Sequence, residues 1–494
     1  MPRKLILAID QSTSATKAML FDAAGALLDK AARPHRQIYP EPGFVEHDAA
    51  EIWANTLDVI ADLIGRNAAS AGEVVGLSIT NQRETVVVFD RATGKPLSNA
   101  IVWQCRRSDG ICDELRAAGH DDEVRAKTGL KVDSYFSATK LKWLARQRPD
   151  IAAKLRDGSA IVGTIDAYLI YRLTGGRTFA TDPTNASRTL LYDIGALRWD
   201  ESLCKLFDVP PAALPEVRES SAKFGETDAG GALPRPVPIC GVMGDSQAAL
   251  FAQCAYRPGD AKATFGTGTS VMVNTAGQRP TGSRGSVAAL AWVHRGAPTY
   301  AAEGIIHASA STIAWLKDGL QLIGSPAEVE ALAAAVPDSG GVYLVPAFSG
   351  LGAPHWSQDA RAAIVGLSWA SRREHVVRAA LESIAYQIRD VVDMMAAESG
   401  VRIAAVNADG GPTANALLMQ MVADLAGVDL IVSDLPELSA LGATFAGLLG
   451  LGLAESLEAL SNLPRQRRVY RPVMDRARAD ALHAGWTRAV QRVL

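Results

Sequence analysis

Residues 8–22 have the sequence AIDQSTSATKAMLFD, and this stretch decides the fold that we expect. Apolar runs at 5–9 and 18–21 flank a short turn rich in serine and threonine, which predicts two strands of one hairpin. The first strand carries Asp10 towards that turn. Backbone N–H groups of such a turn can face oxyanions, and a carboxylate beside them can hold a cation such as Mg²⁺. The hairpin therefore predicts a phosphate site with Asp10 as a metal ligand.

A second stretch repeats this arrangement later in the chain. Residues 265–271 have the sequence FGTGTSV and lead into another apolar run. One turn rich in glycine and hydroxyl side chains is also what an ordinary β-turn looks like. Two of them favour a duplicated fold that holds one nucleotide between its halves.

Composition narrows the class of protein before any other motif is considered. The chain has 494 residues, of which 48% are hydrophobic and 21% are charged, and its net charge is -3. These values are typical of a soluble globular chain of roughly two to four domains. The near-neutral balance and the lack of long basic blocks argue against nucleic acid as a partner.

The sequence also argues against a membrane span. The longest stretch of low charge, residues 443–454, is about half of the roughly 20 residues that span a bilayer, so we expect a buried helix there. The five cysteines are odd in number and have no C-x-x-C spacing, which supports neither a disulfide framework nor a zinc site. We therefore expect a cytoplasmic protein.

Short apolar runs and helical patterns alternate along the whole chain, which predicts an α/β fold with mostly buried sheets. The sequence AYRPGD at 255–260 separates a helical pattern from the second hairpin. We therefore expect an N-terminal domain at 1–254 and a C-terminal domain at 255–494. In the latter, an S-x-x-E capping box at 371–374 predicts the start of a long amphipathic helix.

Residues 406–415, VNADGGPTAN, predict a strand, a glycine turn and the start of a helix. Pro412 suits a first helical turn, and Gly427 is well placed to end the helix. Two adjacent glycines let a ligand approach the backbone, and free N–H groups at a helix start favour a phosphate or a polar adenine edge. Beside two phosphate hairpins, this turn predicts part of a nucleotide site.

Four other residues suggest chemistry on a small polar molecule. Arg83 and Glu84 lie between two apolar runs, where they form either a solvated surface pair or a clamp for the hydroxyls of a polyol. Trp103 could be an apolar wall for the carbon face of such a molecule, or a core residue. Asp245 follows an apolar strand and Gly244, a setting that suits a general base for a hydroxyl nucleophile.

Further stretches complete a pattern that covers nearly all of the chain: 37–40, 43–48, 80–85, 100–107, 135–144, 184–189, 341–354, 362–382 and 381–389. With these stretches the chain resembles the FGGY carbohydrate kinase family, and within it the members that phosphorylate glycerol. The resemblance implies two ribonuclease-H-like lobes of the actin and Hsp70 ATPase type, which flank a nucleotide cleft. ATP would bind mainly to the C-terminal lobe and the polyol to the N-terminal side.

The resemblance also implies roles for individual residues. Arg83, Glu84 and Tyr135 would hold the hydroxyls of the polyol, with Trp103 as the apolar wall. Asp245 would remove the proton from the attacking hydroxyl, and Asp10 would help to hold Mg²⁺ against the phosphates of ATP. The expected cofactor-binding residues are Thr13, Ser14, Lys17, Thr267, Gly268, Ala310, Gly411 and Asn415.

Four positions depart from the pattern of the family members that phosphorylate glycerol. Ser246 replaces a glutamine after the general base, and Ser270 replaces an aromatic residue opposite Trp103, so we expect a larger and wetter substrate pocket. Lys17 replaces an arginine near the phosphates, which keeps the charge but loses the fork geometry. Ala310 replaces a glycine near the adenine.

The sequence therefore predicts an ATP- and Mg²⁺-dependent kinase of a small polyol, with glycerol as the first substrate expected and sn-glycerol 3-phosphate as its product. One alternative is a kinase of a four-carbon polyol or related ketose such as erythritol, threitol or erythrulose. Another is an actin-like ATPase without small-molecule kinase activity, which would leave the residues of the polyol clamp unexplained. The oligomeric state stays open between a homodimer and a homotetramer.

Overall fold

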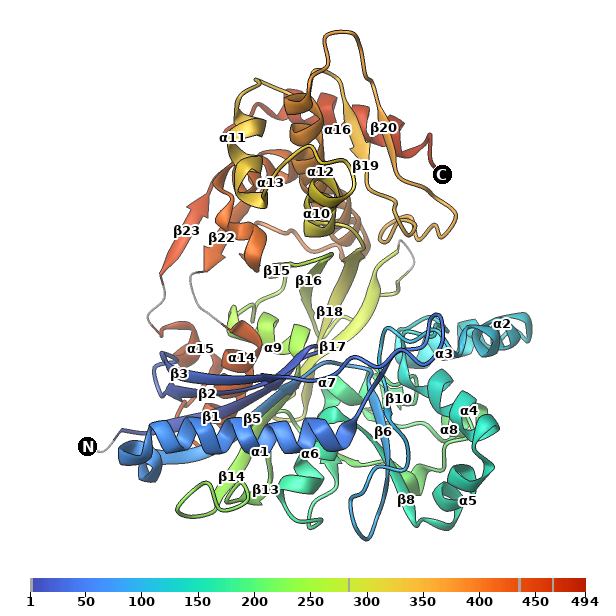
Figure 1. The fold of residues 1–494 in the computed structure, drawn as a ribbon, viewed down its shortest axis with the longest axis vertical. Helices are drawn as coiled ribbons and strands as arrows, with labels where there is room; N and C mark the ends of the chain where they lie inside the picture. The colour runs from blue at the N-terminus through green and yellow to red at the C-terminus, as the bar shows by residue number, and fades with distance from the viewer. Residues whose placement is uncertain (1–2, 283–284, 434–436, 464–465) are drawn as a thin grey trace. The chain divides into compact units, whose positions relative to one another are not determined.

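The computed structural model describes residues 3–282, 285–433, 437–463 and 466–494, and the chain divides into two units (Figure 1). The first unit consists of Met1–Cys254, Ala289–Tyr300 and Pro436–Pro464. The second consists of Ala255–Ala288, Ala301–Leu435 and Arg465–Leu494. The first unit thus contains the expected N-terminal domain together with two segments from later in the chain.

A six-stranded sheet with the order β13-β14-β5-β1-β2-β3 forms the centre of the first unit. Strand β1 is antiparallel to β2 and parallel to β5, and β14 is parallel to β5. The predicted hairpin is therefore confirmed, with longer strands than the apolar runs alone indicate. The bounds are β1 (Leu5–Gln11), β2 (Ala15–Asp22), β3 (Leu27–Pro34), β5 (Val74–Asn81), β13 (Lys223–Thr227) and β14 (Val237–Gly244).

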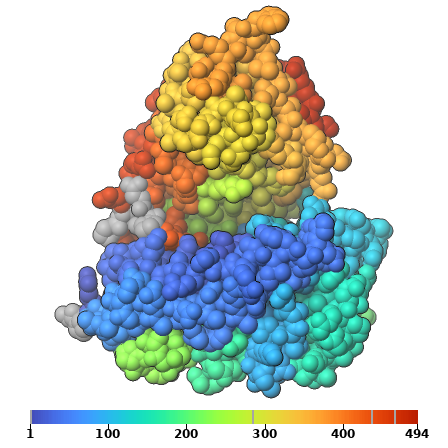
Figure 2. Space-filling model, in the orientation of Figure 1, coloured from blue at the N-terminus to red at the C-terminus, as the bar shows by residue number. Residues whose placement is uncertain are grey.

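Helices pack against this sheet, among them α1 (Ala49–Arg66) and α14 (Leu438–Gly450). Helix α1 begins where the Asp48 side chain accepts the N–H groups of Ala50 and Glu51, and its apolar residues share one core cluster with alternate residues of β1. Helix α14 is mostly buried, which confirms the predicted buried helix over residues 443–448, but the helix ends at Gly450 and residues 451–454 form a half-buried to exposed turn. The N-terminal part of the chain, which includes α1 and is drawn in blue, forms much of the surface of the first unit that Figure 2 shows.

The rest of the first unit carries the loops of the candidate site. A four-stranded sheet has the order β4-β7-β6-β8, with β4 (Glu46–His47), β6 (Val86–Asp90), β7 (Ala100–Ile101) and β8 (Ala160–Thr164). The other helices are α2 (Asp109–Ala117), α3 (Asp121–Thr128), α4 (Ser137–Gln147), α5 (Pro149–Asp157), α6 (Ile165–Leu173), α7 (Pro183–Ala186), α8 (Glu201–Leu206), α9 (Asp245–Ala252) and α15 (Leu457–Ser461).

A seven-stranded sheet with the order β17-β18-β16-β15-β21-β22-β23 forms the centre of the second unit, although residues 289–300 of β17 and β18 belong to the first. Strand β15 is antiparallel to β16 and parallel to β21, which repeats the pairing of β1 with β2 and β5. The predicted duplicated α/β fold is therefore confirmed. The bounds are β15 (Ala261–Phe265), β16 (Thr269–Ala276), β17 (Val287–His294), β18 (Ala297–Ile306), β21 (Ala405–Asp409), β22 (Asp429–Ser433) and β23 (Arg467–Tyr470).

The longest helix of the second unit is α12 (Arg373–Ser399), the long helix that the sequence predicts. Its predicted capping box is wrong by one residue. The Ser371 hydroxyl accepts the N–H of Ser368 in the preceding turn, and His375 Nδ1 accepts the N–H of Arg372 at 3.1 Å. The unit also contains β19 (Tyr343–Val345), β20 (Ala363–Val365), α10 (Ala310–Asp318), α11 (Val329–Ala334), α13 (Ala416–Ala426) and α16 (Arg476–Val490).

Candidate functional site

The β1–β2 hairpin ends in a pair of opposite charges. Asp10 in β1 is opposite Lys17 in β2, and only 6% of Asp10 is exposed. Lys17 Nζ lies 3.5 Å from Asp10 Oδ2 and 2.7 Å from Glu437 Oε2, and Glu437 also pairs with Lys30. Lys17, which the sequence predicts to bind phosphate, is thus held between two carboxylates.

The Asp10 carboxyl group lies in a setting that disfavours its ionised form. Burial raises its pKa to about 6. The Lys17 ammonium opposes this rise in pKa, whereas the negative charges of Asp245 and Glu437 add to it. A second cation near Asp10 would therefore be favoured by the surrounding charge.

The turn between β1 and β2 connects the predicted phosphate residues with the predicted polyol wall. Ser14 is exposed and Thr13 is half-buried. The Trp103 indole Nε1 donates to Thr13 Oγ1 at 3.0 Å, and Gln37 Nε2 donates to the Thr13 carbonyl at 2.9 Å. The position of this turn is therefore coupled to the Trp103 side chain.

Arg83 and Glu84 lie in the loop between β5 and β6, and they are buried, so they are not a solvated surface pair. Arg83 Nε lies 3.3 Å from Asp245 Oδ1, and Arg83 Nη1 donates to Gln247 Oε1 at 3.1 Å. A Cβ at Gly244 would lie 2.8 Å from Arg83 Cγ. The glycine before Asp245 therefore makes room for the Arg83 side chain.

The Glu84 carboxylate has a buried partner that sequence reasoning missed. Arg188 is fully buried, and its Nε donates to Glu84 Oε1 at 2.6 Å. Its guanidinium carbon lies 5.1 Å from the centroid of the Phe136 ring. The only signal in the sequence is that Arg188 lies in the stretch 184–189, which is part of the family resemblance.

Trp103 and Tyr135 form a half-buried aromatic wall, with ring centroids 5.3 Å apart and planes inclined by 56°. The backbone beside Tyr135 is held by the buried Lys140, whose Nζ donates to the carbonyls of Ser134, Tyr135 and Phe136. Burial lowers the pKa of Lys140 to about 8. The wall thus comes from two loops, each with its own hydrogen-bonded support.

Asp245 is the first residue of α9, directly after β14, as the sequence predicts. Its side chain is 40% exposed, and its Oδ1 accepts the N–H of Ser246 at 2.6 Å. Ser246 is half-buried. The first unit therefore brings Asp10, Arg83, Glu84 and Asp245 together through the ends of three adjacent parallel strands, β1, β5 and β14.

The predicted nucleotide residues of the second unit converge on the turn between β15 and β16. Ala310, at the start of α10, donates its N–H to the Gly266 carbonyl at 3.0 Å, and the N–H of Ser309 reaches the carbonyl of Thr267. A Cβ at Gly268 would lie 2.2 Å from the Ile306 carbonyl oxygen. Thr267 is exposed, and Gly268 and Ala310 are half-buried.

The glycine turn after β21 meets the same hairpin. Gly410 has a φ of +100°, and a Cβ there would lie 1.9 Å from the Phe265 carbonyl oxygen. Gly411 is exposed with open space beside it. Asn415 caps α13 by accepting the Leu418 N–H, and Gly427 ends that helix in the left-handed conformation, as predicted. The predicted contact of Asn415 with a nucleotide would have to use the other atoms of its side chain.

Ser270 also lies in the second unit, on β16, whereas the other predicted substrate residues lie in the first. Its side chain is half-buried, and its hydroxyl donates to Glu303 Oε1 at 3.2 Å. Glu303 itself is fully buried. The departure at position 270 thus introduces a hydroxyl that is bound to a buried carboxylate.

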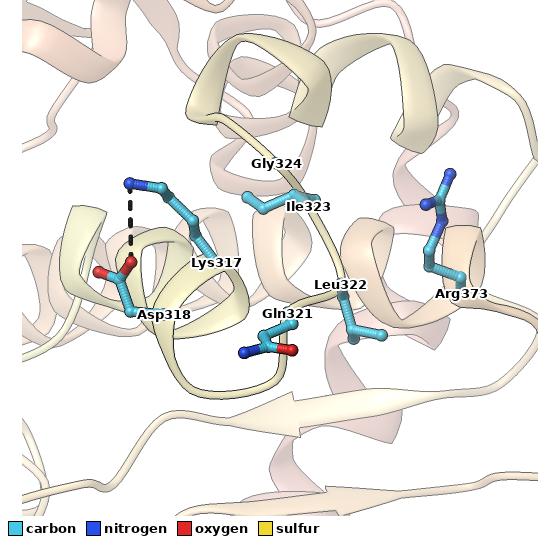
Figure 3. Close-up of a pocket in the computed structure, with 7 residues that line it drawn as sticks. All are labelled: Lys317, Asp318, Gln321, Leu322, Ile323, Gly324 and Arg373. Atoms are coloured by element: carbon cyan, nitrogen blue, oxygen red, sulfur yellow. Dashed lines mark ion pairs between the residues drawn. The ribbon is translucent and has the colours of Figure 1, made fainter.

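One cavity of about 490 Å³ lies at the C-terminal end of α10 (Figure 3). It is lined by Lys317, Asp318, Gln321, Leu322, Ile323, Gly324 and Arg373, and none of the predicted site residues is among them. Within the described residues, no cluster of three or more His, Cys, Asp or Glu side chains could hold a metal ion. No helix in the described parts of the chain has the length and apolar character to cross a membrane.

Comparisons with known proteins find similar sequences and structures. The model of the FGGY family of carbohydrate kinases matches residues 5–252 with its N-terminal domain and residues 261–451 with its C-terminal domain. The chain is 46% identical over 493 residues to a glycerol kinase of Carboxydothermus hydrogenoformans. This match covers 100% of this chain and 98% of the relative. A crystal structure of Plasmodium falciparum glycerol kinase with ADP has a TM-score of 0.94 at 36% identity and covers 100% of this chain and 98% of that one.

Proposed function

The chain belongs to the FGGY family of carbohydrate kinases, and we propose on this basis that it transfers the γ-phosphoryl group of ATP to a hydroxyl of glycerol. The relatives named glycerol kinase match it over its full length. The polyol binds to the first unit and the nucleotide mainly to the second. The product is sn-glycerol 3-phosphate.

The observation that carries this proposal is the junction of Arg83 and Asp245. A guanidinium lies 3.3 Å from a half-exposed carboxylate at the start of a helix, with the buried Glu84 next to it in the chain. Guanidinium N–H groups donate hydrogen bonds to hydroxyl oxygens, and carboxylates accept hydrogen bonds from hydroxyl O–H groups. This set can therefore hold a polyol by two neighbouring hydroxyls. Trp103 and Tyr135 supply the apolar surface for its carbon atoms.

Asp245 acts as the general base in this proposal. It accepts the proton of the attacking hydroxyl at one of its carboxylate oxygens while Arg83 keeps that carboxylate oriented. Phosphoryl transfer leaves little covalent work for the protein, so positioning and charge supply most of the rate.

The residues around Asp10 fit a magnesium ion. Mg²⁺ is usually held by one or two carboxylates together with the phosphates of the substrate and waters, so a cluster of three protein ligands is not required. The buried Asp10 supplies one oxygen, and its raised pKa means that a bound cation would relieve the cost of its charge. When bound, the metal would neutralise charge on the phosphates of ATP.

A coupled assay of ADP release tests the function directly. With ATP and Mg²⁺ present, we expect ADP release only when glycerol or another small polyol is added. ADP release at the same rate with and without polyol would instead support the actin-like ATPase. A four-carbon polyol or ketose is the second candidate substrate, because Ser246 and Ser270 offer hydroxyls and space in place of larger side chains.

A further inference from the structure

A buried segment of the first unit lies directly behind the Asp245 junction. It runs from Asp182 through α7, which is labelled in Figure 1, to Arg188. All of its residues are buried. The Asp182 carboxylate accepts the backbone N–H groups of Thr184 and Asn185 at 3.1 and 3.0 Å. It also accepts the Ser220 hydroxyl at 2.7 Å. The start of α7 is therefore fixed by a single carboxylate with several donors.

The Thr184 hydroxyl connects this carboxylate with the chain just before Asp245. It donates to Asp182 Oδ2 at 2.8 Å, and it accepts the Gly244 N–H at 2.8 Å. Because the hydroxyl proton is directed to the carboxylate, a lone pair of the oxygen is left to face the Gly244 N–H. The Thr184 side chain thus helps to hold the backbone position from which Asp245 extends.

Gly244 is held by this hydrogen bond together with its pairing with Asn81 at the end of β5. It has no side chain of its own, and the place of a Cβ is taken by Arg83, whose Cγ would be 2.8 Å away. Glycine is the residue with the greatest backbone freedom. The junction between β14 and α9 therefore combines the most flexible residue type with the side chain whose position matters most for proton removal.

The same segment also supports the loop that carries the polyol clamp. The side-chain amides of Asn185 and Asn81 exchange two hydrogen bonds, of 3.1 and 2.9 Å, and Asn81 is the last residue of β5. Arg188 pairs with Glu84. One segment therefore reaches the backbone before the base and the loop of the clamp.

We propose that Thr184 is a positioning residue for Asp245, since its hydroxyl joins the buried Asp182 to the Gly244 N–H. This inference rests on the proposed function, in which Asp245 is the general base. It makes kcat depend on a hydroxyl that does not touch the substrate, while the binding of glycerol and ATP does not depend on it.

The test compares Thr184→Val with Thr184→Ser and with a matched control, Thr181→Val. Valine keeps the shape of threonine but removes the hydroxyl, and serine keeps the hydroxyl. Thr181 is also buried, and its hydroxyl donates to the buried carboxylate of Asp166 at 2.6 Å rather than to Asp182. We measure kcat, the KM for glycerol, the KM for ATP and the thermal unfolding midpoint of each variant.

We expect kcat of Thr184→Val to fall about 10- to 100-fold with both KM values within about threefold of wild type, because displacement of a reacting group costs this much. Thr184→Ser and Thr181→Val should stay within about threefold of wild type in kcat. An unchanged kcat in Thr184→Val, or an equal loss in Thr181→Val, would overturn the inference.

If Thr184→Val does not fold, Thr184→Cys replaces it in the same comparison, because a thiol is a weak hydrogen-bond acceptor. Wild type without turnover on any polyol defeats the proposed function as well, whereas an active wild type with an unaffected Thr184→Val defeats only the positioning role.

Discussion

The hairpins β1–β2 and β15–β16 have the same pairing but end in different chemistry. Each has an antiparallel partner and a parallel neighbour, β5 in one unit and β21 in the other. The first ends beside a buried carboxylate that pairs with Lys17, and the second ends in glycines packed against backbone carbonyls. In the proposed function, the shared topology would supply the place for a ligand, while side chains would supply charge in one unit and the bare backbone would allow close approach in the other.

If charged side chains of the first unit catalyse the reaction, Asp245→Asn should lower kcat more than any other substitution considered below. Asparagine has nearly the same shape but is a poor proton acceptor, so we expect kcat to fall on the order of 10²–10⁴-fold. The KM for ATP should change little, since the proposed nucleotide residues lie mostly in the second unit. Turnover within about threefold of wild type in a coupled assay would contradict the role of Asp245.

The cost of burying charge in the first unit can be measured at Asp166, which pairs with no cation among the residues that the structure describes. Burial, and secondarily the charge of Asp182, raise the pKa of Asp166 from 3.8 to about 7, which corresponds to roughly 4 kcal/mol. Because the pKa is higher in the folded state, the folded protein binds this proton more tightly than the unfolded chain does. The contribution of this proton to the free energy of unfolding is therefore fully present below about pH 4 and is lost as the pH rises through about 7.

The neutral variant Asp166→Asn should therefore unfold at a higher temperature than wild type at pH 9, and this advantage should shrink as the pH falls to 5. Thermal unfolding of both proteins across this range is the measurement. A difference between variant and wild type that is the same at every pH would show that Asp166 does not titrate in this range.

The two hairpins and the position of Asp245 could be predicted from the sequence, because each is indicated by a few consecutive residues. Buried strands of a mixed sheet are continuous apolar runs, so both hairpins were visible from a few residues each. The position of Asp245 followed from a strand, a glycine and a helix in succession. The likeness of the two units followed from the repeat of one turn.

Other features had no local signal. Lys17 and Glu437 pair although 420 positions separate them, and the sequence predicts Lys17 as a phosphate ligand without that partner. Arg188 was part of a recognised stretch, but only the folded chain brings it against Glu84. The start of α12 was misjudged because Ser371 uses its hydroxyl in the preceding turn instead of capping the helix. Long-range pairing and competition between nearby acceptors explain these differences.

Gly268→Ala tests the proposed role of the bare backbone in the second unit, because it adds a Cβ to the turn between β15 and β16. The added Cβ would lie 2.2 Å from the Ile306 carbonyl oxygen, so the turn must shift. We expect the KM for ATP to rise about tenfold, with the KM for glycerol little changed. Gly266→Ala is the control, because a Cβ there would meet its nearest neighbour at 3.6 Å, an ordinary contact. Equal KM values for ATP in both variants would contradict the steric argument.

The smallest expected effect concerns Ser270, the substrate residue that the family resemblance predicts in the second unit. The resemblance implies an aromatic residue at position 270, where this chain has a serine whose hydroxyl donates to the buried Glu303. The lost apolar contact should weaken glycerol binding, because about one methylene of contact is worth roughly 1–3 kcal/mol in a pocket. We therefore expect erythritol, threitol or erythrulose to have a kcat/KM within about tenfold of glycerol.

Ser270→Phe should restore the wall, favour glycerol and exclude the longer substrates, as measured by kcat/KM for glycerol and for each four-carbon compound. Ser270→Ala serves as the control, because it removes the donor to Glu303 without adding a wall and should leave the longer substrates accepted. If wild type is strictly specific for glycerol and Ser270→Phe keeps the same selectivity, position 270 does not set the substrate range. The difference between the two units would then lie in their charges and glycines alone.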